Sequence, residues 1–217
     1  METIDFYDLL QQMGMGLLST VQIFVWTLVL SLPLGLAVAF GRMSGNIIVR
    51  SVFKVYISVM RGTPLMLQLI AWYFGGYYLF EFNLPPQLVA IVVGFTLNYA
   101  AYFGEIYRSG IESTPKGQYE AARIMGYTKT QAFMKIILPQ MFKRVMPSIT
   151  NEVITLLKDT SLAFAISYTE MFTIASQISS AQTTFMPLVV AGVFYYIFNF
   201  IVAFIMERIE KRLNYYH

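Results

Sequence analysis

The 217-residue sequence contains no cysteine, and its one histidine, His217, is the last residue. Without cysteine the chain can form no disulfide, no thiolate metal site and no thiol nucleophile. A single histidine supplies too few ligands for a histidine-based metal centre, so we expect no metal site. The pattern G-x-x-x-x-G-K-[ST] of an ATP-binding phosphate loop is also absent. No catalytic constellation can be named either, so we expect this chain to be neither an enzyme by itself nor the holder of a cofactor.

Charged residues are scarce, at 12% of the chain against 57% hydrophobic residues. A soluble domain usually carries about 25% charged residues. Four stretches carry no charge at all, namely residues 9–41, 62–80, 82–104 and 171–206. Each is long enough to cross a membrane as a helix, which takes about 20 apolar residues. The sequence therefore predicts an all-α integral membrane protein.

We expect a single transmembrane domain over residues 1–217, with five spans at about 16–40, 62–81, 86–107, 147–176 and 186–206. The fourth span contains Glu152, Lys158, Asp159 and Glu170. We expect it to be broken or re-entrant near its outer end, because irregular backbone inside a membrane must be covered by protein or water.

Basic residues favour one orientation of this arrangement. Fourteen of the 15 Lys and Arg residues lie before the second span, between the third and fourth spans, or after the fifth. All three segments fall on the same side of a five-span protein, so the positive-inside rule places the C-terminus in the cytoplasm and the N-terminus outside. We expect a multi-pass protein of a plasma (inner) membrane. Residues 2–13 mix apolar and polar side chains and predict an interfacial amphipathic helix, with a disordered tail as the alternative.

A polar link joins the third and fourth spans and has the pattern of two short helices. Residues 118–125 are strong helix formers, and Gly126 interrupts them at a turn. Thr128 can cap a second helix over residues 131–137, which we expect Pro139 to end.

The same link resembles the EAA loop of ABC importer permeases, in the spacing of Glu120-Ala121-Ala122, Gly126 and Ile137-Leu138-Pro139. Three further segments resemble the polar amino acid uptake subfamily: Arg61-Gly62-Thr63-Pro64, Gly104-Glu105-Ile106-Tyr107-Arg108 and Leu157-Lys158-Asp159-Thr160-Ser161-Leu162. The resemblance covers essentially the whole chain. It implies the type I ABC importer permease fold, with five transmembrane helices around a central pathway and a cytoplasmic two-helix coupling loop at residues 115–140.

The resemblance also implies a function, the import of an L-amino acid into the cell. An extracytoplasmic binding protein would deliver the amino acid, and two separate ATPase subunits would bind ATP and Mg and supply the energy. We expect Glu120, Ala121, Ala122 and Gly126 to couple the chain to the ATPase. Small alanines allow close approach of a partner, Glu120 can pair with a basic group, and Gly126 permits the turn. A homodimer is favoured, and a heterodimer with a sister permease is the alternative.

Two carboxylates of the fourth span indicate the substrate. Glu152 and Asp159 are seven residues apart, which places both on one helix face with a separation of about 10 Å. A cationic amino acid carries positive charge at both ends, so arginine, lysine and histidine are favoured, with other polar amino acids such as glutamine and cystine as alternatives. We expect Asn98, with Tyr102 nearby, to hold the substrate carboxylate. In the alternative interpretation Glu152 or Asp159 pairs with Lys158 of a neighbouring helix or of the partner subunit, or Asp159 bonds backbone groups at a helix break.

A different class of function is a secondary transporter or channel that uses the acidic residues to couple an ion. Such transporters usually show paired internal repeats. No repeat is visible in this sequence, which therefore favours the ABC permease.

Overall fold

The computed structural model describes residues 5–213, so the expectations for residues 1–4 and for His217 lie outside the described part. That part consists of helices joined by short loops and contains no strand, which confirms the all-α class. Its elements, in chain order, are α1 (Phe6–Arg42), α2 (Ile47–Gly62), α3 (Leu65–Phe80), α4 (Gln87–Glu112), α5 (Lys116–Ile124), α6 (Lys129–Ala132), a π-helix (Phe133–Ile137), α7 (Leu138–Asp159), a 3-10 helix (Thr160–Ile166), α8 (Met171–Gln182) and α9 (Met186–Leu213).

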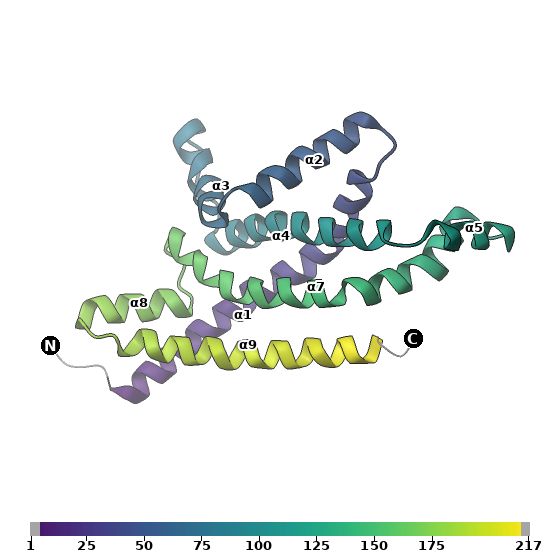
Figure 1. The fold of residues 1–217 in the computed structure, drawn as a ribbon. Helices are drawn as coiled ribbons and strands as arrows, with labels where there is room; N and C mark the ends of the chain where they lie inside the picture. Colours follow the sequence, from purple (N-terminus) through teal and green to yellow (C-terminus); the bar gives the residue numbers. More distant parts are fainter. Residues whose placement is uncertain (1–4, 214–217) are drawn as a thin grey trace.

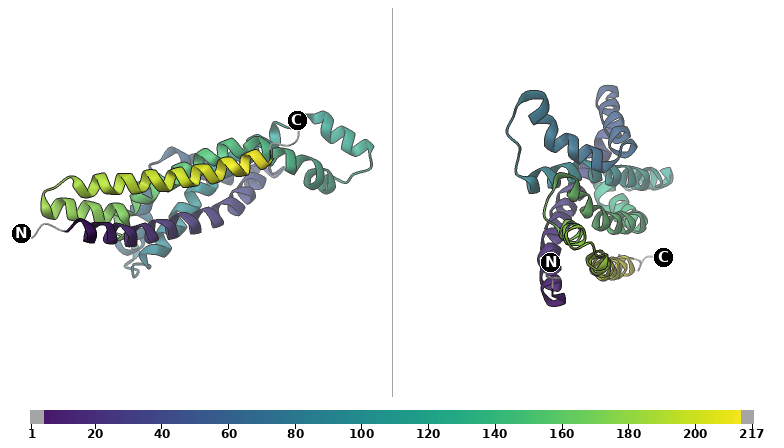
Figure 2. Two further views of the ribbon diagram at one scale, coloured as in Figure 1. Left: turned by 90° about the horizontal axis from the view of Figure 1, so that it is seen from below. Right: turned by 90° about the vertical axis from the view of Figure 1, so that its left-hand side faces the viewer.

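Helices α4, α7 and α9 run roughly along one direction, and α1 crosses them (Figure 1). The start of α1 and the end of α9 lie at opposite ends of the molecule, and α5 projects at the end where α9 finishes. The view from below in Figure 2 (left) shows the same separation of the two ends. The helix-rich body is therefore elongated, with one end formed by the α5–α6 segment.

Helices α1 and α4 cross closely in the core. A Cβ added to Gly35 would lie 2.7 Å from the Cβ of Phe103, and one added to Gly104 would lie 2.6 Å from Cγ1 of Val38. Both positions exclude any larger residue, because small residues let helix backbones approach in membrane proteins. This crossing fixes α4, which carries one wall of the site described below.

Three helices, α1, α4 and α9, are long and apolar enough to cross a membrane, and α3 is a shorter apolar helix. The predicted fourth span, 147–176, is interrupted at two places within the described residues: α7 ends at Asp159, and the 3-10 helix ends at Ile166, just before Ser167, whose φ is 58°. The number and bounds of the five spans stay a prediction.

The prediction that Pro139 ends a helix is wrong. The chain is helical without interruption from Lys129 to Asp159, and Pro139 lies in the first turn of α7. A π-helix at Phe133–Ile137 directly precedes it. Proline lacks an N–H and its ring collides with a carbonyl of the previous turn in a regular α-helix. The wider π-turn supplies a different hydrogen-bond pattern just before the proline, and the helix continues.

Two segments differ from the prediction in their helices. The link before the second span contains α2, whose first turn is capped by Asn46, with Ile48 N donating to Asn46 Oδ1 at 2.9 Å. Residues 6–13 are helical as expected, but they are the first turns of α1 rather than a separate interfacial helix. Leu9 and Met13 are buried there in a cluster with residues of α8 and α9.

Candidate functional site

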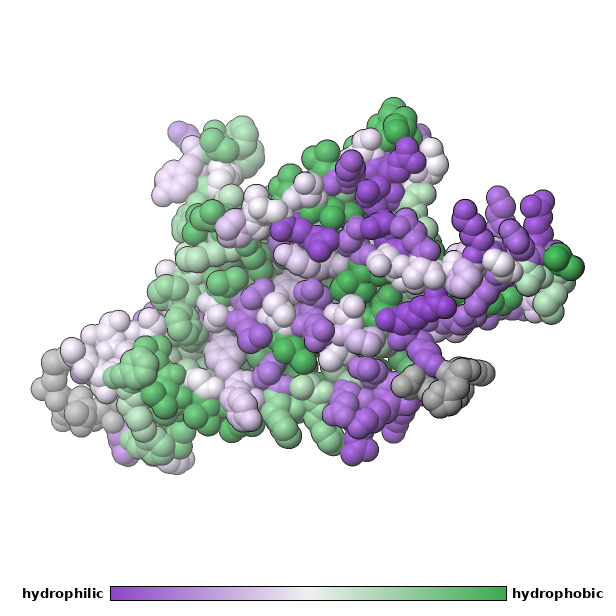
Figure 3. Space-filling model, in the orientation of Figure 1, coloured by the Kyte–Doolittle hydropathy of each residue, from purple (hydrophilic) through white to green (hydrophobic). Residues whose placement is uncertain are grey.

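Helix α7 has one apolar and one polar face. Its buried residues are Met141, Val145, Met146, Ile149, Val153, Leu156 and Leu157, and its exposed polar residues are Arg144, Ser148, Asn151, Thr155 and Lys158. Figure 3 shows hydrophilic residues over the middle of the face where α4 and α7 run, as well as at the α5 end. A charge in the hydrocarbon costs about 2.5–3.5 kcal/mol. The polar face of α7 therefore has to meet water or protein rather than lipid.

A cavity of about 390 Å³ lies against this polar face, and we name it the Asp159 cavity. Its lining comes from α4, α7, the α2–α3 junction and the 3-10 helix: Thr63, Pro64, Leu65, Asn98, Tyr99, Tyr102, Glu152, Thr155, Asp159 and Leu162. All four residues expected to contact substrate, Glu152, Asp159, Asn98 and Tyr102, are brought together here. The seven-residue spacing of the two carboxylates accounts for their shared cavity.

Asp159 is held by a residue that the sequence analysis missed. The Oη of Tyr99 donates to Asp159 Oδ2 at 2.7 Å. Tyr99 is buried, and its ring lies 6.0 Å from that of Tyr102, measured between centroids. The sequence shows two tyrosines near Asn98, Tyr99 and Tyr102, and does not distinguish them. Only Tyr99 reaches Asp159, which lies on another helix. The bond orients one carboxylate oxygen and leaves the other free for a ligand.

Asn98 has partners within the protein. Its Nδ2 donates to the carbonyl of Met60 and to Oε1 of Gln68, both at 2.9 Å. The Gln68 amide in turn donates to Oγ1 of Thr63 at 2.7 Å. Asn98 and Gln68 thus tie the α2–α3 junction, where the helix breaks, to α4. The expectation that Asn98 holds the substrate carboxylate stays a prediction, and in this conformation both of its amide hydrogens are already donated.

Within one copy of the chain, the described residues form neither of the structural alternatives for the two carboxylates, and pairing with Lys158 of a partner subunit stays a prediction. Lys158 is exposed and forms no ion pair with residues 5–213, and Glu152 has no hydrogen-bond partner there. Asp159 does not cap the 3-10 helix that follows it. The hydroxyls of Thr160 and Ser161 bond the carbonyls of Leu157 and Lys158 instead, at 2.7 and 2.8 Å. The carboxylates are therefore available to a ligand, with Tyr99 as their one bonded neighbour.

A second cavity of about 300 Å³ adjoins the first on the side nearer α5, and we name it the Arg61 cavity. Tyr102 and Glu152 line both cavities; the other lining residues are Arg61, Glu105, Ile106, Ser109, Gly110, Ser113, Arg144, Val145 and Ser148. The guanidinium carbon of Arg61 lies 5.2 Å from the centroid of the Tyr102 ring. The two cavities form one polar track between α4 and α7, and Glu152 lies where they meet.

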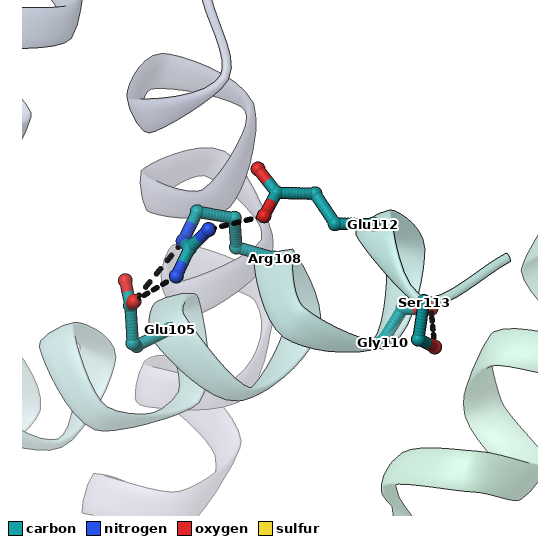
Figure 4. Close-up of polar contacts among 5 residues, drawn as sticks. All are labelled: Glu105, Arg108, Gly110, Glu112 and Ser113. Carbon is teal, nitrogen blue, oxygen red and sulfur yellow. Dashed lines mark hydrogen bonds and ion pairs between the residues drawn. The ribbon is translucent and has the colours of Figure 1, made fainter.

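Glu105 and Arg108 form the local ion pair that their spacing predicts (Figure 4). Arg108 Nε donates to Glu105 Oε1 at 3.0 Å, and the same guanidinium pairs with Glu112 one turn further on. The bond to Glu105 raises the pKa of Arg108, which lies beyond the predicted third span. Ser113 Oγ donates to the carbonyl of Gly110 in the same turn, at 2.8 Å. Arg144 of α7 donates to the Ser113 carbonyl at 3.0 Å, so α4 and α7 are joined at this end.

The turn between α5 and α6 is as predicted. Gly126 has a φ of +81°, a conformation that glycine adopts without strain. Thr128 caps α6 in a capping box, accepting from Gln131 N at 3.2 Å while its own N–H donates to Gln131 Oε1 at 3.0 Å. These bonds give the loop a defined shape.

Of the four residues expected to couple the chain to the ATPase, three are exposed and one is buried. Glu120, Ala121 and Gly126 are exposed, whereas Ala122 is only 1% exposed and packs inside the loop. Only Ala121 of the two alanines can therefore meet a partner directly. The apolar tip of the loop was not predicted from the sequence: Ile124 and Met125 are 87% and 72% exposed. An apolar tip on a charged segment is typical of a protein-docking surface.

Glu170, the remaining acidic residue of the predicted fourth span, has a structural environment. It is 0% exposed and caps α8, accepting from the backbone N–H groups of Phe172 at 2.8 Å and Thr173 at 2.6 Å. The hydroxyl of Tyr195 on α9 donates to it at 3.0 Å, and Thr20 of α1 lies 3.5 Å away. Glu170 therefore joins three helices and has no free position for a ligand.

Residues 31–215 match the family described as "Binding-protein-dependent transport system inner membrane component". The chain is 37% identical over 200 residues to the arginine transport system permease protein ArtQ of Bacillus subtilis (strain 168), a match that covers 92% of this chain and 91% of the relative. It is 36% identical over 219 residues to the L-cystine transport system permease protein TcyB of the same organism, covering 97% and 92%.

Two solved structures of ABC transporters are also similar to this chain. The crystal structure of an amino acid ABC transporter with histidines superimposes with a TM-score of 0.86 at 30% identity, covering 97% of this chain and 100% of that one. The inward-facing MetNI methionine ABC transporter gives a TM-score of 0.74 at 20% identity, covering 99% and 100%, and so shares the fold.

Proposed function

This chain belongs to the family of binding-protein-dependent transport system inner membrane components, and from that premise we propose that it is the transmembrane subunit of an ATP-driven importer of L-amino acids. The all-helical architecture and the match to an amino acid ABC transporter confirm the type I ABC importer permease fold. Permease subunits are not enzymes themselves. The chain forms the path of the substrate, and a separate ATPase supplies the energy.

The Asp159 cavity carries this proposal. Two carboxylates, Glu152 and Asp159, line a cavity whose described lining includes no lysine or arginine. Half-buried negative charge at membrane depth, with no ion pair inside the chain, attracts a cationic ligand. A basic amino acid, arginine, lysine or histidine, places positive charge at its α-ammonium and at its side-chain tip, which suits two carboxylates two helical turns apart. The relatives named for arginine and L-cystine transport support an amino acid as cargo, with other polar amino acids as the alternative.

The partners follow from the family and the loop. We expect two ATPase subunits, which bind ATP and Mg, to dock on the exposed side of α5 and its tip, and an extracytoplasmic binding protein to deliver the amino acid. A homodimer is favoured because this one chain carries both carboxylates, and a heterodimer is the alternative. Replacement of Gly126 with Asp strains the turn, so ATP hydrolysis is expected to continue without transport in a purified complex. Wild-type transport by that variant would exclude the coupling role.

The positions of the helix ends support the proposed orientation. The α5–α6 segment and the end of α9, both rich in lysine and arginine, lie at the same end of the molecule (Figure 1). The start of α1 lies at the other end. With the basic end in the cytoplasm, the N-terminus is outside a bacterial inner membrane and the ATPases dock inside.

The test is uptake of labelled arginine into vesicles that contain the chain, its ATPase and its binding protein. Unlabelled arginine, lysine or histidine should compete, and Asp159→Asn should reduce uptake, whereas Asp8→Asn, an exposed carboxylate at the start of α1, should not. The same binding protein serves all variants, so a difference between them belongs to this chain. Absence of competition by every cationic amino acid would overturn the two-carboxylate argument.

A further inference from the structure

The Arg61 cavity contains two opposite charges that lack partners. Among residues 5–213, Arg61 forms no ion pair, and Glu152 forms neither an ion pair nor a hydrogen bond. Arg61 comes from α2 and Glu152 from α7, and both line the same cavity without pairing with each other. The other charged groups of the cavity are already bonded, Glu105 to Arg108 and Arg144 to the carbonyl of Ser113. The available positive and negative charge thus come from different helices.

We propose that the Arg61 cavity is a second amino acid subsite, which takes the α-carboxylate of the substrate at Arg61 and its α-ammonium at Glu152. A zwitterion placed between two unpaired opposite charges satisfies both, and charge-assisted hydrogen bonds of this kind are the strong ones. The planar guanidinium of Arg61 offers two parallel donors to a carboxylate, and the Tyr102 ring beneath it restricts its position. A volume of about 300 Å³ is at the small end of ligand sites, as a single amino acid requires.

The two cavities differ in the chemistry that they offer. The described lining of the Asp159 cavity has carboxylates but no basic group, so it binds the positive ends of the substrate. The Arg61 cavity has a free guanidinium as well, so it also binds the carboxylate. Glu152 is shared, and an ammonium can keep its contact with Glu152 while the rest of the amino acid moves from one cavity to the other. This subsite rests on the proposed amino acid transport and lies on the α5 side of the first site, where the substrate would leave.

The test is equilibrium binding of labelled L-arginine to the complex of this chain and its ATPase in lipid nanodiscs. The wild-type chain should bind two arginines per copy. Argininamide, which keeps both positive groups but lacks the carboxylate, should displace arginine from the Asp159 cavity only. Arg61→Gln should weaken one of the two sites about tenfold. Arg50→Gln removes an exposed arginine of α2 that lines neither cavity and should leave both sites unchanged.

The outcomes separate this subsite from the proposed function. One arginine per chain that Asp159→Asn removes and Arg61→Gln leaves unchanged supports the first site and overturns the second. Displacement of both arginines by argininamide also overturns it, and this measurement needs no variant to fold. Two sites, of which Arg61→Gln removes one and Asp159→Asn removes neither, support the subsite and contradict the role of Asp159. Absence of any binding overturns both proposals.

Discussion

Glu152 and Glu170 lie 18 residues apart in one predicted span, and their surroundings are opposite. Glu170 is fully buried and accepts hydrogen bonds from two backbone N–H groups and two hydroxyls within 3.0 Å. Glu152 is half-buried, lines two cavities and has no hydrogen-bond partner among residues 5–213. A charge inside a membrane is costly in both cases. The difference lies in the number of hydrogen-bond partners: Glu170 has several and holds helices together, whereas Glu152 has none and is left for a ligand.

The largest effect is expected at the bonded carboxylate. Glu170→Ala leaves the first N–H groups of α8 and the Tyr195 hydroxyl without an acceptor, and each buried unsatisfied group costs about 1–3 kcal/mol. We expect the free energy of unfolding to fall by roughly 3 kcal/mol, measured by thermal unfolding in detergent. Glu170→Gln keeps an acceptor oxygen and should lose less. Unchanged stability of Glu170→Ala would contradict the structural role of Glu170 and its contrast with Glu152.

The next effect is expected at the unbonded carboxylate, in binding rather than stability. Glu152→Gln breaks no hydrogen bond to a described residue, so unfolding should change by less than about 0.5 kcal/mol. Loss of one charged partner should weaken arginine binding about tenfold. Binding and unfolding are measured on the same preparation. A variant that loses stability as Glu170→Ala does, while binding normally, would reverse the two assignments.

Tyr99 lies between these extremes, because it bonds a carboxylate that still has a free oxygen. Tyr99→Phe removes one hydrogen bond to Asp159, of about 1 kcal/mol, so the KM for arginine uptake should rise roughly fivefold with little change in the maximal rate. Tyr107→Phe is the matched control, since this buried tyrosine of α4 lines neither cavity. Equal effects of the two variants would show that Tyr99 does not act through Asp159.

The smallest effect is expected at an exposed carboxylate. Glu207 accepts a hydrogen bond from Lys211 one turn further along α9, which lowers the pKa of Glu207. A lowered pKa means that any stabilisation is present at neutral pH and is lost as the pH falls through the carboxyl range. Exposed pairs contribute little, so Lys211→Gln should leave the thermal midpoint unchanged at pH 7 and at pH 4. A measurable shift at pH 7 would contradict this.

Local patterns were enough to predict much of the site. The seven-residue spacing of Glu152 and Asp159 places both on one helix face, and the structure has them on one cavity. Gly126 and Thr128 act within a few residues of themselves, so the turn and its cap were predictable. The same is true of Glu105 and Arg108, which are one turn apart.

Contacts between distant segments were not predictable. The choice of Tyr99 over Tyr102 depends on Asp159, 60 residues later, and the partners of Asn98 depend on where the α2–α3 junction packs. Ala121 and Ala122 are equivalent in the sequence, and only the packing of α5 buries one of them. Glu170 was grouped with the other acidic residues because the groups that donate hydrogen bonds to it lie on three helices.

The π-helix before Pro139 has a mechanical consequence. Because it lets the helix continue, residues 129–159 form one continuous helix of about 45 Å, which contains a second proline at Pro147 and runs from the coupling loop to the Asp159 cavity. A tilt of this whole helix by a few degrees about its end at the loop would displace Asp159 by a few ångströms. Pro139, which the sequence predicted to end a helix, instead lies inside the helix that would transmit motion from the ATPase to the substrate cavity.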